Sequence, residues 1–297
     1  MVRPLHFHPN PETAADNAFQ SRACRQPPDE TARLAYAEVS HAAARLEVAG
    51  VRVHLFDDDG ARSTPDSVFP NNWFSTHAGG HVALYPMFAP NRRRERRSDI
   101  IEDLKSTYRV QDVIDYSGLE HDGMFLEGTG AMVLDHVARI AYTAQSNRAN
   151  PVALERFCTH FNFEPMAFAT ADAQGQACYH TNVMLCVGTD FALGGFYLIA
   201  DTQRRVAVRE RLRESGRELI ELDAQQIGDF AGNALELSGR GGERLLALSE
   251  RACASLSAAQ KAVIERSATL LPLTVPTIEL AGGSVRCMLA GIHLARR

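Results

Sequence analysis

Short alternating runs of hydrophobic and polar residues recur along this chain, and longer helical patterns separate them at regular intervals. The clearest predicted helix spans residues 29–50, because Asp29 and Glu30 suit a helix start and Gly50 suits a C-cap. The alternating segment 51–56 directly after it predicts a strand. The same patterns predict strands at 82–85, 110–116, 131–134, 138–142, 164–168, 183–187, 196–200, 218–222, 234–237, 245–248 and 270–273, and helices at 93–107, 151–161, 203–215 and 257–267.

The order strand, strand, helix, strand repeats in these predictions with a nearly fixed period. A fixed period longer than about 20 residues is typical of a repeat architecture. We therefore predict an α/β fold in which residues 1–297 form a single domain, a five-bladed α/β propeller of ββαβ units around a central channel. A doubly wound α/β sheet is the competing interpretation, but that fold has one strand for each helix rather than about three.

The composition is that of an ordinary globular protein. Of 297 residues, 45% are hydrophobic and 23% are charged, and the formal net charge is −5. These values exclude a disordered, collagen-like or coiled-coil chain. The acidic balance argues against binding to nucleic acid or to an anionic membrane. The basic run at 91–97 is interpreted as a solvated loop and helix start.

Neither a membrane span nor an export signal is predicted. The most apolar stretch, 191–200, has about half of the ~20 residues that a span needs, and the N-terminus lacks an apolar signal segment. The expected location is therefore cytoplasmic. His6 and His8 lack a third ligand and are interpreted as surface groups. The six cysteines form no CxxC pair, which argues against a zinc site: Cys24, Cys158, Cys178, Cys186, Cys253 and Cys287. No metal or organic cofactor is expected.

Five polar residues occupy equivalent positions of the repeat, each just before the predicted first strand of a unit. They lie 53 to 55 residues apart and comprise Asn72, Glu127, His180, Asn233 and Cys287. Because equivalent positions of a propeller surround the same end of its channel, we expect these side chains to converge on one cavity. A thiol, an imidazole and a carboxylate supply a nucleophile, an acid/base and an orienting group. Each alone also fits a structural role, but their coincidence favours catalysis.

At these residues the chain resembles the amidinotransferase and arginine deiminase superfamily, the penteins, over essentially its whole length. Residues 121–130 (HDGMFLEGTG) resemble that family's Glu-Gly-Gly-Asp region, and the His-Thr-Asn-Val segment that begins at His180 resembles its His-x-Asp segment. Residues 282–288 (GGSVRCM) resemble its glycine-rich nucleophile motif. The resemblance implies Cys287 as the nucleophile, His180 as the acid/base and Glu127 as the carboxylate that orients the histidine.

The substrate follows from the departures from the deiminase pattern. The opening of the chain, residues 15–20 and residues 69–73 are closer still to one branch, the citrulline-utilisation hydrolases (citrulline ureidases). Family members that bind a guanidinium place two aspartates against it, whereas Asn72 and Asn182 stand at the matching positions here. A carboxamide complements a neutral ureido group and leaves no buried charge unpaired. The predicted reaction is hydrolysis of a ureido C–N bond, with L-citrulline giving ornithine, carbon dioxide and ammonia.

Further residues complete the predicted substrate site. Asn72 and Asn182 are expected to hold the ureido group, and backbone NH groups near Gly282 and Gly283 to stabilise the oxyanion. The family resemblance implies Arg148 as the partner of the substrate α-carboxylate. Asn17 and Asn233 are expected to line the mouth of the cavity, unless they cap turns.

Two other interpretations remain open on the sequence. The first is an arginine deiminase or arginine dihydrolase, in which a carboxylate such as Asp122 would recognise a guanidinium. The second is a non-catalytic pentein that acts as a binding protein, which leaves the coincidence of Cys287, His180 and Glu127 unexplained. In each case the expected partner is a small-molecule ureido or guanidino amino acid, and a homo-oligomer is possible.

Overall fold

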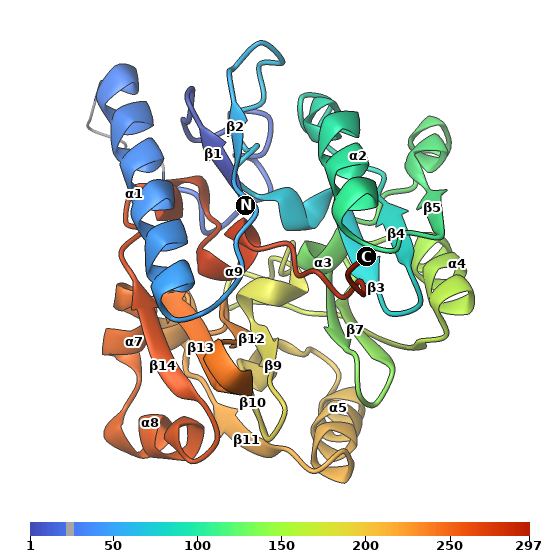
Figure 1. The fold of residues 1–297 in the computed structure, drawn as a ribbon. Coiled ribbons are helices and arrows are strands. Elements are labelled where there is room, and N and C mark those ends of the chain that lie inside the picture. Colours follow the sequence, from blue (N-terminus) through green and yellow to red (C-terminus); the bar gives the residue numbers. More distant parts are fainter. Residues whose placement is uncertain (22–26) are drawn as a thin grey trace.

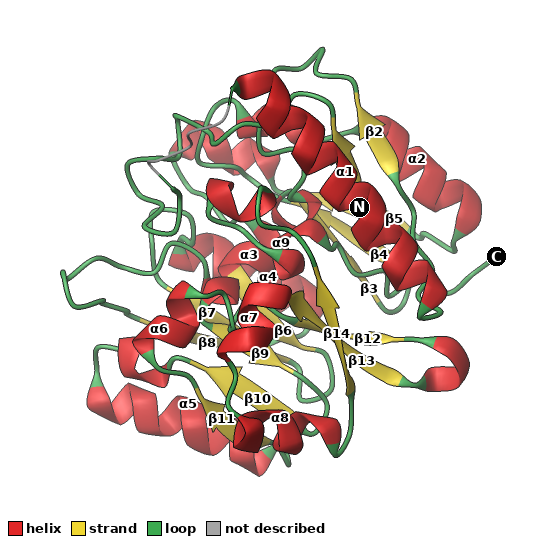
Figure 2. Cartoon of the chain, turned by 90° about the vertical axis from the view of Figure 1, so that its left-hand side faces the viewer, coloured by secondary structure: helices red, strands yellow, loops and turns green. Residues whose placement is uncertain are grey.

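Five β-sheets surround a common centre in the part of the chain that the structure describes, with long helices on the outside (Figure 1). The structure is a computed structural model that describes residues 1–21 and 27–297, so that Cys24 lies outside the described residues. Figure 2 shows the same arrangement from the side, with the helices flanking the sheets. The predicted five-bladed α/β propeller is confirmed.

Four units contain a three-stranded sheet with the same connection. The first strand pairs antiparallel with the second, and the third pairs parallel with the second after a helical crossover. The units are β3 (Phe74–His77), β4 (His81–Leu84), α2 (Ser98–Thr107), β5 (Asp112–Asp115); β6 (Met132–Asp135), β7 (Ile140–Ala144), α4 (Pro151–Phe161), β8 (Glu164–Phe168); β9 (Leu185–Val187), β10 (Phe191–Gly194), α5 (Thr202–Glu214), β11 (Glu218–Glu221); and β12 (Leu235–Ser238), β13 (Arg244–Ser249), α7 (Glu250–Ser255), α8 (Ala258–Glu265), β14 (Thr269–Leu273). A short helix, α6 (Ala224–Gly228), follows β11.

Both ends of the chain build the fifth unit. β1 (Val2–Pro4) pairs parallel with β2 (Phe56–Asp58), and α1 (Pro28–Val48) connects them. The C-terminal segment completes this side of the ring: Thr76 Oγ1 donates to the carbonyl oxygen of Gly291 and accepts from the backbone NH of His293. The N-terminal and C-terminal residues therefore close the propeller together.

Short helical turns carry the polar residues of the repeat to the centre. They precede the first strands and are η1 (Pro70–Asn72), α3 (Gly128–Ala131), η4 (Thr181–Val183) and α9 (Val285–Met288). α3 packs against η1 and η4, and α9 packs against η1. These contacts bring residues that are about 50 to 200 positions apart in the sequence to one end of the channel, as a propeller requires.

Three of the predicted elements are wrong in type or extent. Residues 51–55 form no strand, because only Phe56–Asp58 reach a partner, β1. The predicted strand at 196–200 is instead the turn η5 (Phe196–Leu198), and β10 precedes it. Most of 191–200 is buried, so an alternating pattern is absent there and the Gly194–Gly195 pair ends the strand. The predicted helix 93–107 is interrupted and comprises η2 (Arg92–Glu95) and α2.

Apolar side chains between the units form the core. Trp73, Tyr85, Tyr142, Phe157 and Phe191 are among the largest buried side chains. Within residues 1–21 and 27–297, no helix has both the length and the apolar character needed to cross a membrane.

Candidate active site

Two side-chain amides hold the sulfur of Cys287. The residue lies in α9 and is only 3% exposed. Asn182 Nδ2 and Asn233 Nδ2 donate to Cys287 Sγ over 3.2 and 3.3 Å. Asn233 is itself fixed, because its Nδ2 also donates to the backbone oxygen of Asn182 and its Oδ1 accepts from the backbone NH of Arg286. Two amide donors stabilise the negative charge that a sulfur carries when it acts as a nucleophile.

His180 and Glu127 form the second pair of the site. His180 Nε2 donates to Glu127 Oε2 over 2.7 Å, which leaves Nδ1 as the nitrogen able to accept a proton. Burial lowers the pKa of His180 to about 4, although the hydrogen bond to Glu127 and its charge oppose this shift. At neutral pH the imidazole is therefore uncharged and can act as a general base.

Glu127 is fully buried and stays ionised because cations surround it. Burial acts to raise the pKa of its carboxyl group, but Arg148, His180 and Arg92 together hold that pKa well below its ordinary value. The backbone NH of Phe88 donates to Oε1 over 2.9 Å. Both carboxylate oxygens are thus engaged, which fixes the orientation of the imidazole.

Acid is expected to destabilise the fold through its buried histidines. Burial lowers the pKa of His180 to about 4 and that of His77, in β3, to about 3, from an ordinary value of 6.5. The unfolded chain therefore takes up protons below about pH 6.5 that the folded chain binds only near these lower values. Each histidine should remove about 1.4 kcal/mol of the free energy of unfolding for each pH unit between about 6.5 and 4. Urea unfolding at pH 7, 6 and 5 measures this slope.

The variant His77→Gln provides the control for that slope. It should lower the pH dependence of the free energy of unfolding by the contribution of one histidine, about 1.4 kcal/mol for each pH unit, whatever its effect on stability at pH 7. A slope that is unchanged in this variant would contradict the assignment.

Arg148 joins Glu127 to the N-terminal segment of the chain. Its Nη1 lies 3.5 Å from Glu127 Oε2, while Nη2 and Nε donate to the two oxygens of Asp16 over 2.5 and 3.0 Å. Its guanidinium also lies over the ring of Tyr179, 5.0 Å from the ring centroid. Tyr179 in turn donates its hydroxyl to the carbonyl oxygen of Gly282. The predicted carboxylate partner thus already binds a carboxylate of this chain.

Arg92 is the second buried cation beside Glu127. Its Nη1 lies 3.7 Å from Glu127 Oε2, and it donates from Nε and Nη2 to Glu95 over 2.9 and 3.0 Å. Asp66 Oδ2 lies 3.6 Å from Arg92 Nε and accepts from Asn10 Nδ2. The other oxygen of Asp66, Oδ1, is buried and has no hydrogen-bond partner among the described residues. Asp66 therefore keeps an acceptor free inside the protein.

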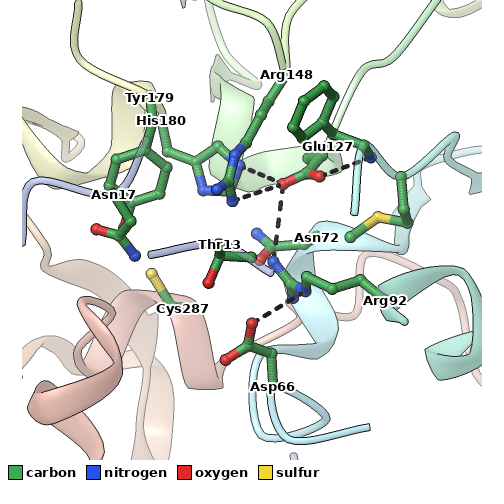
Figure 3. A network of polar contacts seen from close by, with 12 residues as sticks. Thr13, Asn17, Asp66, Asn72, Arg92, Glu127, Arg148, Tyr179, His180 and Cys287 are labelled. Atoms are coloured by element: carbon green, nitrogen blue, oxygen red, sulfur yellow. Dashed lines mark hydrogen bonds and ion pairs between the residues drawn. The ribbon is translucent and has the colours of Figure 1, made fainter. Parts of the chain in front are cut away.

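These groups line one small cavity (Figure 3). It is bounded by Thr13, Asn17, Asp66, Phe69, Asn72, Arg92, Arg148, Tyr179, His180, Ala281, Gly283 and Cys287. Asn17 Nδ2 donates to the carbonyl oxygen of Ala281. Gly282, at φ +80°, allows this approach, because a Cβ there would lie 2.5 Å from the Asn17 amide. The sulfur, the imidazole and both cations thus face one space.

The structure brings most of the predicted site residues together, but two of them, Asn233 and Asp122, do not lie where the sequence predicts. Asn17, Asn72 and Arg148 line the cavity together with His180 and Cys287, whereas Asn182 and Asn233 are hydrogen-bonded to the sulfur and do not belong to the cavity lining. Asn233 therefore does not line the mouth, because its amide is used to hold Cys287 and the start of α9. Asp122 is exposed at the end of a surface turn, where it cannot meet a ligand in the cavity.

The repeat pattern does not identify Arg92 and Asp66 in the cavity lining, or Asp16 and Glu95, which pair with the two arginines. The run at 91–97 is not simply solvated: Arg92 and Glu95 are each 3% exposed. The spacing of three between Arg92 and Glu95 could have indicated burial, because residues three apart on a helical turn can form an ion pair that neutralises both charges. Asp66 and Asp16 lie outside the repeated positions and gave no signal. His6 and His8 are exposed, and no group of potential metal ligands occurs among the described residues.

Gly130 is expected to be essential for activity because of the space beside it. A Cβ at this position would overlap with Asn72 Nδ2 and lie 2.8 Å from His180 Nδ1. The variant Gly130→Ala should therefore lose about 100-fold or more in kcat/KM through displacement of the imidazole. Gly118→Ala is the matched control, since nothing lies within 4 Å of its Cβ, and it should retain full activity. Equal activity of both variants would show that the Nδ1 side of His180 is not used.

The repeated units and the convergence of a cysteine, a histidine and a glutamate at one end of the channel define a pentein, the superfamily of amidinotransferases and arginine deiminases. Within that superfamily the chain belongs to the family described as N,N dimethylarginine dimethylhydrolase, eukaryotic, whose sequence model matches residues 3–294. These relatives are hydrolases, so the protein is an enzyme of this class. Among curated proteins no sequence matches the chain.

Solved structures share the fold at low sequence identity. The N-terminal domain of ArgZ, a cyanobacterial arginine dihydrolase solved as a cysteine-to-serine variant with substrate, is 16% identical with a TM-score of 0.72, over 97% of this chain and 95% of that one. AgrE with ornithine and NAD+ is 17% identical with a TM-score of 0.73, over 97% of this chain but 38% of AgrE. A dimethylarginine dimethylaminohydrolase variant, as an adduct with S-methyl-L-thiocitrulline, is 14% identical with a TM-score of 0.64, over 100% and 98%.

Proposed function

We propose that the protein is a cysteine hydrolase that cleaves a ureido C–N bond, with L-citrulline as its substrate. The observation that carries this proposal is the set of groups at the sulfur: Asn182 and Asn233 donate to it, and Asn72 lines the cavity nearby. Among the described residues, no carboxylate is hydrogen-bonded to Cys287. A neutral ureido group suits such surroundings, whereas a guanidinium would leave its charge without a partner at the reacting end.

The charged groups of the cavity suit the amino-acid end of the substrate. Arg148 is proposed to bind the α-carboxylate, which would replace Asp16 in the bidentate pair seen here. Arg92 adds a second positive charge in the same cavity. The free Oδ1 of Asp66 is suited to accept a hydrogen bond from the α-ammonium group. The charges therefore select a zwitterion, and the amides select its neutral end.

The proposed chemistry proceeds through a covalent intermediate. His180 Nδ1 takes the proton of Cys287, and the sulfur attacks the ureido carbon, so that a C–S bond forms. The terminal C–N bond breaks and the nitrogen takes the proton from His180, leaving as ammonia. His180 then takes a proton from water, which attacks the same carbon and breaks the C–S bond. The released carbamate of ornithine decomposes to ornithine and carbon dioxide.

The chain's own groups support each of these steps. Glu127 stabilises the imidazolium that forms when His180 carries the proton. Backbone NH groups near Gly282 and Gly283 are proposed to stabilise the oxyanion. Gly283 lies close to the nucleophile, because a Cβ built on it would lie 3.3 Å from the Cβ of Cys287. No step requires a group from outside the chain except substrate and water.

Hydrolysis of a guanidino substrate is the second candidate. ArgZ, an arginine dihydrolase, shares the fold, and an asparagine-to-serine variant of its N-terminal domain holds a covalent reaction intermediate. Asp66 supplies a carboxylate in the cavity that could meet a cation. A binding protein without activity is the third candidate.

Protection of Cys287 from iodoacetamide distinguishes these candidates. Alkylation is followed by mass spectrometry, because the chain has other cysteines. We expect Cys287 to react faster than the other cysteines and L-citrulline to slow its alkylation more strongly than L-arginine at equal concentration. Stronger protection by L-arginine would favour the guanidino candidate. A slowly reacting Cys287 with no protection by either compound would overturn the assignment of a catalytic thiol.

A further inference from the structure

A second pocket lies at the other end of the central channel. Its volume is about 230 Å³, and it is lined by the first strands of four units and by the C-terminal segment that closes the fifth: Phe74–Thr76, Leu134–Val137, Val187–Thr189, Leu235–Glu236, Gly291 and His293. The catalytic residues precede these strands, whereas most of this lining lies along the strands or beyond them. Thr129 and Arg286, from the short helices, form its inner wall. The two cavities thus share a wall that contains α9.

Arg286 brings an unneutralised positive charge to this second pocket. Its Nη1 donates to the carbonyl oxygen of Leu289, and no carboxylate among residues 1–21 and 27–297 forms an ion pair with it. Burial lowers the pKa of its guanidinium, and the nearby sulfur atoms of Cys287 and Cys186 oppose this shift only in part. An oxyanion is the ligand that such a group requires.

The other polar groups of the pocket leave this charge available. Arg217 also lines it but is neutralised by Asp135, which it meets through Nη1 over 2.7 Å and Nη2 over 3.0 Å. His136 and His293 stack with ring centroids 3.9 Å apart and can donate to an anion. Glu236 is the one carboxylate there without an ion pair among the described residues, and it accepts hydrogen bonds from the backbone NH and hydroxyl of Thr189.

Arg286 is directly connected to the nucleophile. It precedes Cys287 in α9, and its backbone NH donates to Asn233 Oδ1 over 3.1 Å. The same Asn233 side chain donates to Cys287 Sγ. The guanidinium charge also acts on the sulfur through space. An anion on Arg286 would therefore cancel a positive charge that lies close to the sulfur of Cys287.

We propose that this second pocket binds a small oxyanion, a phosphate or carboxylate group, on Arg286, and that its occupancy lowers the reactivity of Cys287. The site differs from the substrate cavity in its residues, its position and its ligand. It makes the far end of the channel an inhibitory effector site.

Titration calorimetry with inorganic phosphate and with succinate tests the binding, with sodium chloride at matched ionic strength as the reference. We expect saturable binding of at least one of the two anions, which identifies the source of the oxyanion. Arg286→Met should abolish it, because the charge is lost. Glu236→Gln should tighten it, because a repelling carboxylate is removed. Arg244→Met, which removes an exposed arginine paired with Asp190, is the control and should leave binding unchanged.

The effect of the bound anion on Cys287 is measured as the rate at which iodoacetamide alkylates this residue. This rate does not depend on the identity of the substrate. A bound anion should slow this reaction about threefold or more, and only when Arg286 is present. Absence of saturable binding by either anion, or binding that persists in Arg286→Met, would overturn the proposal. Binding without a change in alkylation would overturn the coupling to Cys287.

Discussion

Cys287→Ser should abolish hydrolysis and leave the fold intact. The variant removes the thiolate on which the covalent pathway depends, so kcat/KM for L-citrulline should fall by about 10⁴-fold or more. The serine hydroxyl can still accept from the amides of Asn182 and Asn233, which are the two hydrogen bonds that the sulfur receives. The midpoint of thermal unfolding should therefore change little. Initial rates of ornithine release measure the loss.

Cys253→Ser is the matched control for this experiment. Cys253 lies in α7, is partly exposed and is remote from the cavity lining. Its replacement should leave kcat/KM within about twofold of the original value, as expected for a surface substitution. Substantial activity in Cys287→Ser would mean that the cysteine is not the nucleophile.

Glu127→Gln should impair both catalysis and stability. The carboxylate accepts from His180 Nε2 at 2.7 Å and lies 3.5 and 3.7 Å from Arg148 and Arg92. Glutamine is neutral, so two buried guanidinium groups would lose their shared counter-ion and the imidazolium would lose its stabilisation. We expect kcat/KM to fall by about 10³-fold and the free energy of unfolding to fall by about 3–5 kcal/mol.

The pH dependence gives this prediction a sign. The pKa of Glu127 is lowered in the folded protein, so its contribution to stability is present above the pKa of the unfolded carboxyl group and is lost as the pH falls through the folded value. Glu127→Gln should remove this part of the acid response. Glu218→Gln, at an exposed pair with Arg266, should change neither activity nor stability appreciably. An equal effect of both substitutions would contradict the role of Glu127 as the shared counter-ion of Arg92, Arg148 and His180.

The repeat explains why the sequence predicts that the three catalytic candidates meet at one place. Glu127, His180 and Cys287 occupy one position of successive units, and a closed ring necessarily brings that position to one end of its channel. No knowledge of long-range contacts was needed. A five-bladed propeller therefore brings Glu127, His180 and Cys287 to the same end of its channel.

The remaining cavity residues could not be derived in this way. Asp66 in the cavity and Asp16, which binds Arg148 beside it, come from irregular segments whose positions depend on packing far along the chain. Arg92 stands in a strongly charged run, a pattern more typical of solvated surface, and is buried only because Glu95 and Asp66 neutralise it. The strand position failed for a related reason: every residue of β10 is buried, so the alternation that distinguishes a strand is absent there, and the pattern places the strand at 196–200 instead.

The choice between a ureido and a guanidino substrate depends on the carboxamides at the sulfur. Asn182 and Asn233 provide neutral donors where a guanidinium would require negative charge. The two arginines, Arg92 and Arg148, serve either substrate equally, because both substrates share the α-carboxylate end. Selectivity is therefore expected to lie in the amides.

The most direct test measures ornithine and ammonia released from L-citrulline and from L-arginine by the unmodified protein. We expect L-citrulline to be hydrolysed with one ammonia for each ornithine, and kcat/KM for L-arginine to be lower by about 100-fold or more, the penalty of a buried charge without a partner. Faster consumption of L-arginine, with citrulline accumulating or with two ammonia for each ornithine, would contradict this expectation.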